Sequence, residues 1–530
     1  MNGRIATASL ALLLVAGACT TSSTAKTSPT VFRMSLGEPL SIDPYNAVES
    51  EGILVARLLF KGLVDLDPKT GTIVSGLAEK WAKDDACKTW TFTVKQGTTF
   101  SNGEPVTADS FVAGMTRAVK QAAASDAASF LSEIVGFGDV HGTETAKATT
   151  GVLRGVVARD PSTLVITLDT ADCDLVTRML HPVFSPVPTS AGDAPNATFG
   201  VLPIGNGPFK MAGPWEHDKR IALVRNDAYA GPRPAIDRVE ITIQTLDQEY
   251  KAFQAGDVDW ARVPPELVAQ ARSTYEPSGG FLKQVTYGLT YLVVATNSAP
   301  LNNADARRAV SAAIDRRAII DGVFKAPLEP ATSIIPPVFK DYYTRGQCEA
   351  CQFDLAKARA WAAAGGLTAD TTITLSFNAD GGNQAFVEAI ADQLKTGLGV
   401  KVDVVSIAKF SDMLTAMQRK DGTGLYRMGW AADYPSPLDF LEPLLGTGGG
   451  ANYSNYSSAD FDQLLAGASA ASSTAEKARS VAKAERLVLD QMALVPLWYN
   501  TEFRVFKHAR WKGLAIDFWG NPTLASATSA

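Results

Sequence analysis

The sequence predicts a large α/β protein with two or more lobes, and three observations support this. The chain has 530 residues, which is too long for a single hydrophobic core. Its composition, 46% hydrophobic and 20% charged residues, is that of an ordinary globular protein. Residues 77–111 place a strand pattern, a turn and a helix start in direct succession. Periodicity by itself supports no finer class than α/β.

The segment 77–111 predicts a strand, a hairpin and a helix. In TWTFTV, apolar residues alternate with threonines as in a half-buried strand: Trp90, Phe92 and Val94. Asn102-Gly103 is a pair that tolerates the positive φ angles of a tight turn. Thr107 then offers its hydroxyl as the N-cap of a helix beginning at Ala108.

A second helix is predicted near the C-terminus. Ser473 and Glu476 have the spacing of a capping box, which opens a helix through about residue 492. Helical spacing directs one apolar set inward: Ala478, Val481, Ala484 and Val488.

The charge balance excludes some partners. The formal net charge is −6, spread without long runs, and no basic patch indicates binding to nucleic acid or to a membrane surface. One segment, residues 5–18, is apolar enough to enter a membrane but too short to span it, and Arg4 precedes it. We therefore expect a secretory signal in residues 1–18, followed by a flexible tether in residues 19–30 that is rich in Ser and Thr.

An exported protein matures in an oxidising compartment, where an even number of cysteines favours disulfides. Beyond Cys19, four cysteines remain: Cys87, Cys173, Cys348 and Cys351. Cys348 and Cys351 have a metal-like spacing, but no second pair or nearby histidine completes four ligands. We expect a local disulfide there and, by elimination, a bond between Cys87 and Cys173.

No reactive constellation predicts an enzyme. The histidines are dispersed without the HExxH spacing, and neither a GxSxG elbow nor a Walker loop occurs. Gly205-Asn-Gly207 lacks the third glycine of a dinucleotide loop, and Pro208 follows where a helix should begin. No catalytic residue, metal or cofactor is expected.

Several blocks resemble the peptide- and nickel-binding receptors of bacterial ABC importers, family 5 of the extracytoplasmic solute-binding proteins. Residues 77–111 are similar to a segment that its peptide-binding members share. Other similar blocks follow in the order of the family: 202–211, 221–229, 237–243, 253–260, 291–297, 305–316 and 429–440. The resemblance spans almost the whole chain after residue 30.

The resemblance implies a bilobed periplasmic-binding-protein-like fold of type II with an extra subdomain, in which the chain crosses between the lobes twice. We place the crossings near Val285 and Val495. The expected domains are lobe I (31–62, 189–285 and 496–530), the extra subdomain of lobe I (63–188) and lobe II (286–495).

The family also implies a location and partners. Val15 to Cys19 resembles a lipobox, although Ala16 replaces the preferred leucine, so Cys19 is the expected site of lipidation. The protein would be anchored to the cell membrane on its extracytoplasmic side. We expect a monomer that delivers its ligand to a permease driven by ATPase subunits.

The block 425–437 is the expected ligand site. In oligopeptide binders, the aspartate that corresponds to Asp433 receives the α-ammonium group of the peptide, and the position of Arg427 can carry an arginine that faces the ligand carboxylate. Trp430 and Tyr434 would line the cleft. The structural alternatives are a turn cap for Asp433, an exposed strand-end charge for Arg427 and core positions for the aromatic residues.

Two other functions stay open at this point. Relatives with the same fold bind haem, nickel complexes, opines or oligosaccharides, and a secreted hydrolase is the alternative from another class. Stoichiometric binding without turnover would exclude the hydrolase.

Overall fold

The computed structural model describes residues 29–67, 72–142, 146–419 and 422–530. The predicted signal, most of the tether and Cys19 lie outside these ranges. Within them, no helix has both the length and the hydropathy that a membrane crossing requires.

The segment 77–111 folds as predicted. It forms strand β5 (Thr89–Val94), whose apolar side chains are buried, and helix α2 (Ala108–Val119), which Thr107 and Ser110 close with a capping box. Strand β5 belongs to an antiparallel sheet of order β4-β5-β7-β6. Its other strands are β4 (Ala78–Lys83), β6 (Val156–Asp160) and β7 (Thr163–Thr167).

A second sheet has the order β1-β10-β9-β8 and packs on helix α1 (Ser50–Leu59). Its strands are β1 (Val31–Leu36), β8 (Phe209–Met211), β9 (Arg220–Arg225) and β10 (Arg238–Ile243). β1 pairs parallel to β10, and the other pairs are antiparallel. All four strands lie in the ranges predicted for lobe I.

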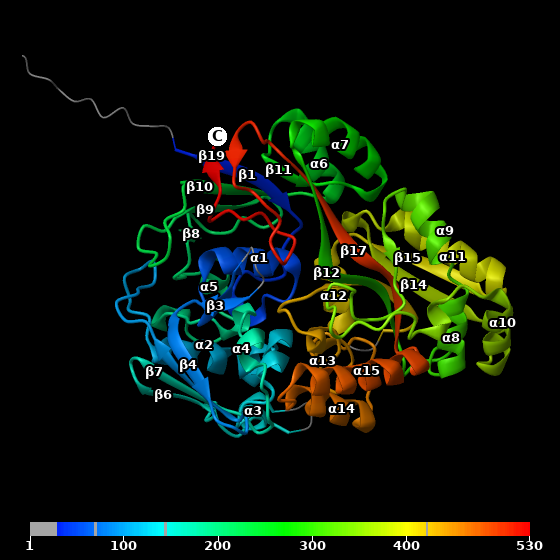
Figure 1. The fold of residues 1–530 in the computed structure, drawn as a ribbon, viewed down its shortest axis with the longest axis horizontal. Helices are drawn as coiled ribbons and strands as arrows, with labels where there is room; N and C mark the ends of the chain where they lie inside the picture. The colour runs from blue at the N-terminus through cyan, green and yellow to red at the C-terminus, as the bar shows by residue number, and fades with distance from the viewer. Residues whose placement is uncertain (1–28, 68–71, 143–145, 420–421) are drawn as a thin grey trace, which may run out of the picture.

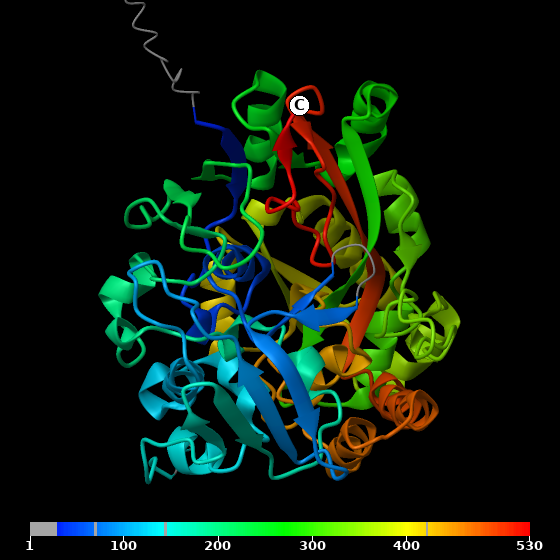
Figure 2. The same cartoon turned by 60° about the vertical axis from the view of Figure 1, so that its left-hand side comes forward.

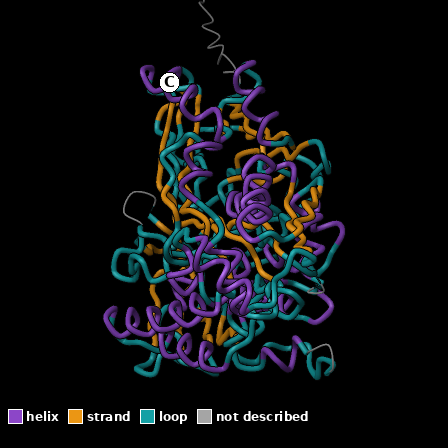
Figure 3. Tube along the Cα trace, turned by 90° about the vertical axis from the view of Figure 1, so that its right-hand side faces the viewer, coloured by secondary structure: helices purple, strands orange, loops and turns teal. Residues whose placement is uncertain are grey.

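The largest sheet has the order β11-β17-β12-β16-β14-β15. Its strands are β11 (Trp260–Arg262), β12 (Phe281–Val294), β14 (Thr372–Asn378), β15 (Lys401–Ile407), β16 (Leu425–Ala431) and β17 (Leu494–Phe506), and β13 (Glu329–Pro330) adds to β17. The long antiparallel strands β12 and β17 run side by side between the two halves of the molecule (Figures 1 and 3). The predicted crossings, near Val285 and Val495, lie within them, while the exact domain limits stay a prediction.

Helices cover the rest of the large sheet and the contact between the predicted subdomain and the predicted lobe II. Helix α15 (Thr474–Gln491) begins as predicted, because the Ser473 side chain accepts a hydrogen bond from the Glu476 N–H. Val481, Ala484 and Val488 are buried, whereas Ala478 is half-buried. Helices α13 (Glu442–Leu445) and α14 (Ala459–Ser469) lie near α15 (Figures 1 and 2), and α4 (Leu175–Arg178) is linked to it by the ion pair of Lys477 with Asp174. Helix α3 (Phe137–His141) contacts α2.

The remaining short strands and helices complete the two halves. The strands are β2 (Val64–Leu66), β3 (Ile73–Ser75), β18 (Trp511–Lys512) and β19 (Thr528–Ser529). The helices are α5 (Ala197–Val201), α6 (Leu246–Ala255), α7 (Val268–Tyr275), α8 (Ala304–Ala312), α9 (Arg316–Ile319), α10 (Leu355–Ala364), α11 (Gln384–Leu398) and α12 (Phe410–Gln418).

Candidate ligand-binding cleft

Strand β16 has one edge that the sheet leaves open. It pairs with β12 along its whole length, but its other edge pairs with β14 only at Leu425 and Tyr426. The Ala432 N–H donates to the Tyr287 carbonyl oxygen of β12, and successive residues of a strand direct their amides to opposite edges. Gly429 and Ala431 therefore present their amide and carbonyl groups to the open edge. Such an edge is a template for another extended chain.

Two cavities follow this open edge. The first has a volume of about 100 Å³ and includes Asp433 in its lining, and the second has a volume of about 280 Å³ and includes Arg427. Six lining residues belong to both: Ser50, Glu51, Phe410, Gly429, Trp430 and Ala431. The cleft thus runs along β16 with a carboxylate at one end and a guanidinium at the other.

Asp433 is buried, with 5% of its surface exposed, and both its main-chain N–H and its carbonyl oxygen form hydrogen bonds with side chains. Its N–H donates to Oδ2 of Asp439 (2.7 Å), and its carbonyl oxygen accepts from Arg57 Nη2 (3.1 Å) and Trp519 Nε1 (2.9 Å). The carboxylate itself has no hydrogen bond or ion pair with any described residue. Burial raises the pKa of Asp433 to about 7, and the nearby Arg57 charge opposes this rise only in part.

Arg427 is a cation without an anionic partner within ion-pair distance among the described residues. Its side chain is half-buried and lines the second cavity, and its Nε is buried without a hydrogen-bond partner. Burial lowers the pKa of Arg427 to about 10, while Tyr291 and Asp380 favour its charged form. The guanidinium is therefore available to an anion in the cleft.

The two aromatic residues predicted for the site are not placed together. The Trp430 side chain lines both cavities of the cleft, and its Nε1 donates to Oδ2 of Asp439 (3.2 Å). Tyr434 is 2% exposed and lines a different cavity, where its ring meets the Phe130 ring edge-on at 6.3 Å between centroids. The structure thus brings Arg427, Trp430 and Asp433 to the cleft but separates Tyr434 from them.

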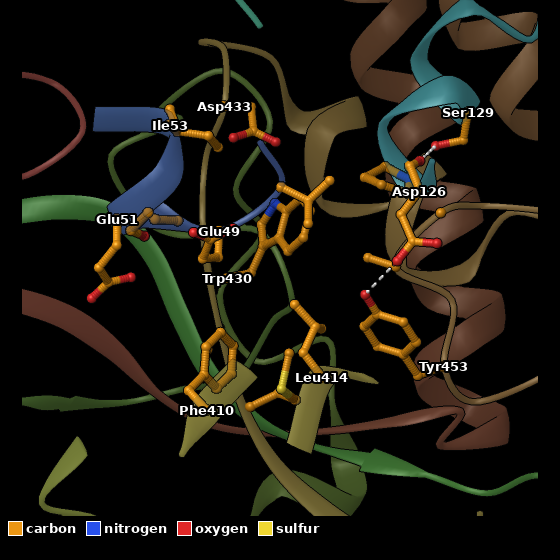
Figure 4. A pocket seen from close by; sticks show the side chains of 18 of the residues that line it. Glu49, Glu51, Ile53, Asp126, Ser129, Phe410, Leu414, Trp430, Asp433 and Tyr453 are labelled. Carbon is orange, nitrogen blue, oxygen red and sulfur yellow. Dashed lines mark hydrogen bonds between the residues drawn. The ribbon is translucent and has the colours of Figure 1, made fainter. Parts of the chain in front are cut away.

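Besides Glu51, two further carboxylates in the first cavity were not predicted from the sequence, those of Glu49 and Asp126 (Figure 4). Glu49 is the N-cap of α1: its Oε1 accepts from the N–H groups of Leu40 (3.0 Å) and Gly52 (2.8 Å), and its Oε2 is buried without a partner. Asp126 Oδ2 accepts from Gln418 Nε2 (2.7 Å) and from the Tyr453 hydroxyl (3.3 Å). Neither carboxylate belongs to a recognisable motif, and the one signal for Glu49 was its place just before an apolar helix.

A second group of acidic side chains forms ion pairs with an arginine of the chain. Arg178 Nη2 lies 3.1 Å from Asp172 Oδ2 and 3.0 Å from Glu442 Oε2. These three side chains are buried or nearly so, and we call them the paired cluster. Arg178, Glu133 and Glu442 line a third cavity of about 860 Å³, together with Tyr434.

The cysteines of the described ranges lie in two bonded pairs. The sulfur atoms of Cys87 and Cys173 are 2.03 Å apart, and those of Cys348 and Cys351 are 1.98 Å apart. The Cys173 N–H also donates to the Ser469 carbonyl oxygen (2.9 Å), which joins the subdomain to the end of α14. Whether both pairs are oxidised in the mature protein stays a prediction, which peptide mapping without reductant tests.

Comparisons with known proteins agree with this architecture. A family model described as bacterial extracellular solute-binding proteins, family 5 Middle, matches residues 72–452. The periplasmic oligopeptide-binding protein OppA of Salmonella typhimurium is 30% identical over 90% of this chain and 88% of its own length. The oligopeptide-binding protein OppA of Bacillus subtilis is 27% identical over 88% of this chain and 86% of its own length.

Solved structures give the same result for the fold. The murein tripeptide binding protein MppA of Escherichia coli has a TM-score of 0.84 and 25% sequence identity, covering 95% of this chain and 99% of that chain. The fold is the bilobed α/β fold of periplasmic binding proteins, as the sequence predicted. The chain belongs to family 5 of the bacterial extracellular solute-binding proteins, and it is therefore a binding protein and not an enzyme.

Proposed function

We propose that this protein captures oligopeptides between its two lobes and delivers them to an ABC permease. One observation carries the proposal: an open strand edge lies between an unpaired carboxylate, Asp433, and an unpaired guanidinium, Arg427. An extended peptide has the complementary groups, which are an ammonium at one end, a carboxylate at the other and main-chain donors and acceptors between them.

Each contact has a physical reason. A buried charge is costly without a partner, so the α-ammonium of a peptide would relieve Asp433 while Asp433 replaces the water that the ammonium loses. Gly429 and Ala431 would pair with the peptide main chain, which provides affinity with little dependence on sequence. Relatives that are named oligopeptide-binding proteins support the same ligand class.

The first test removes the ammonium site. Asp433→Ala is expected to weaken peptide binding by about 30-fold to several thousand-fold, because a buried ammonium without its carboxylate costs about 2 to 5 kcal/mol. Calorimetry with a tripeptide measures this. Asp403→Ala, which removes an exposed carboxylate on β15, is the matched control and should bind normally.

A second arm changes the ligand instead. Acetylating the N-terminus of the peptide removes the same charge and should weaken binding to the wild type by a similar factor. The two changes should not add, since both delete one interaction. Equal binding of free and acetylated peptides would contradict the proposal and favour a non-peptide ligand, which native mass spectrometry of the purified protein would identify.

The membrane anchor and the transport partners belong to the same proposal. Cys19 would carry the acyl chains, and stable anchoring needs more than one chain at about 0.8 kcal/mol per buried methylene. Cys19→Ala should therefore move the protein from the membrane fraction to the soluble fraction of cells. An unchanged distribution would refute the anchor without affecting the proposed ligand.

A further inference from the structure

We propose that the cleft selects peptides whose first residue carries a cationic side chain, lysine or arginine. This inference rests on the peptide-binding function proposed above. The observations behind it are the number of carboxyl groups in the first cavity, a buried oxygen of Glu49 without a hydrogen-bond partner and an indole ring that lines the same cavity.

The first cavity contains more carboxyl groups than one ammonium can pair with. Four carboxylates line it, those of Glu49, Glu51, Asp126 and Asp433, and no lysine, arginine or histidine is among its lining residues. Asp433 is assigned to the α-ammonium, and Glu51 has a cationic partner in Arg262 (3.4 Å). A second cation in this cavity would still find Glu49, which has no ion pair with any described residue.

Glu49 has the geometry of a half-satisfied acceptor. It is 7% exposed, and its Oε1 already accepts two main-chain hydrogen bonds. Its Oε2 is buried in the described structure without a donor. A buried polar atom without a partner is uncommon in folded proteins and requires an explanation, and a donor from the ligand supplies one. Capping α1 needs only the oxygen that is already used.

The aromatic surroundings suit a cation. Figure 4 shows the Trp430 indole between Glu49 on one side and Asp126 on the other, with Asp433 nearby. The indole N–H is engaged by Asp439, so the ring is fixed in place. A guanidinium or ammonium over such a ring gains a cation–π attraction while it pairs with the carboxylates.

The geometry also favours the first side chain of the peptide. Asp433 holds the α-ammonium in the same cavity, and the next side chain of an extended peptide points to the opposite face. The cavity adjoins the third cavity along residues that line both: Asp126, Ser129, Phe130, Pro443 and Gly450. A side chain as long as lysine or arginine therefore has room to extend.

A proton balance provides an independent readout. Burial, aided by the Glu51 charge, raises the pKa of Glu49 to about 8, against the main-chain donors of Leu40 and Gly52. At neutral pH the free protein therefore holds a proton on Glu49, and a cation placed beside it would expel that proton. Asp126 and Asp433 also line this cavity, so only the difference between two ligands is informative.

The test compares Lys-Ala-Ala with Met-Ala-Ala by calorimetry at neutral pH in two buffers of different ionisation enthalpy. The wild type should bind the lysine peptide at least about tenfold more tightly, as expected for one charged hydrogen bond, and should release more protons with it. In Glu49→Gln, which keeps the capping oxygen, both differences should vanish. Glu388→Gln, an exposed change on α11, should preserve them.

Each other result overturns the inference in a recognisable way. Equal affinity of the two peptides for the wild type refutes it while the proposed function stands, and this comparison needs no variant. An equal loss for both peptides in Glu49→Gln assigns Glu49 to the helix cap alone and also refutes it. Binding of neither peptide to the wild type overturns the proposed function, and this inference with it.

Discussion

Two groups of buried carboxylates in the described structure, the paired cluster and the cleft, differ in where the compensating cation comes from. In the paired cluster, the chain supplies Arg178 to Asp172 and Glu442. In the cleft, Glu49 and Asp433 have no cation within ion-pair distance among the described residues. Because an uncompensated buried charge is costly, the first arrangement serves the fold and the second suits a ligand that brings the charge.

The pKa values alone would not separate the two groups. Burial raises the pKa of Asp172 and of Glu442 in the paired cluster, as it raises the pKa of Asp433 in the cleft. The ion pairs make the distinction, since Arg178 lies within 3.1 Å of two carboxylates. Perturbed titration marks candidate sites only when geometry shows that a partner is missing.

The paired cluster also joins parts of the chain that are distant in sequence. Asp172 and Arg178 come from the predicted subdomain, and Glu442 comes from the predicted lobe II. Lys477 adds a second ion pair across the same contact, to Asp174. This cluster therefore holds the contact between the two parts together.

The largest expected effect comes from removing the internal cation. Arg178→Met leaves two carboxylates buried without their partner and should lower the free energy of unfolding by about 3 to 5 kcal/mol, measured by denaturant titration. Arg220→Met, at an exposed i,i+4 pair, is the control and should cost little. If the two variants lose the same stability, the paired cluster is not structural.

A smaller effect is expected from the disulfide beside the paired cluster. Cys173 lies between Asp172 and Asp174, and its bond to Cys87 closes a loop with a sequence separation of 86. Replacing Cys87 and Cys173 by alanine should lower the free energy of unfolding by about 2 to 4 kcal/mol, measured by denaturant titration. The Cys348–Cys351 bond, with a separation of 3, constrains the unfolded chain much less, and its removal should cost less. Free thiols at all four positions in the mature protein would contradict both assignments.

The smallest effect concerns the cleft and depends on pH. An aspartate in the unfolded chain titrates near about 3.9, and burial raises the pKa of Asp433 to about 7. Between these values the folded state holds more protons, so this contribution to stability is present below about pH 4 and is lost as the pH rises through about 7. Relative to the wild type, Asp433→Asn should therefore gain about 1 to 3 kcal/mol between those limits. Parallel stability curves for the two proteins would contradict this.

Local structure was predictable because its causes are local. Alternating residues in TWTFTV gave β5, and the Thr107 hydroxyl marked the start of α2. The block 425–437 was likewise singled out as a candidate from a contiguous motif, and its role in binding stays a prediction. Asp433 and Tyr434 lie in a bend just after β16 ends at Ala431, and the motif does not show that their side chains enter different cavities.

The other half of the cleft could not be predicted from the sequence. Glu49 and Asp126 reach the cavity from segments more than 300 residues away from Asp433, and no motif links them to it. Their roles depend on which hydrogen bonds are already used, as for the two oxygens of Glu49. Which oxygen already has a hydrogen-bond donor can be determined only from three-dimensional contacts.

The open edge of β16 also sets a length. Arg427 lies on β16 and Asp433 lies in the bend after it, six positions later, so the about 20 Å that six extended residues span at about 3.3 Å each is an upper limit for their separation. Because both side chains can extend inward, the ligand that satisfies the two ends together is shorter than this. Because the two charged groups sit at fixed positions, the cleft would bind peptides of one length more tightly than shorter or longer ones. Peptide length would then affect affinity more than peptide sequence.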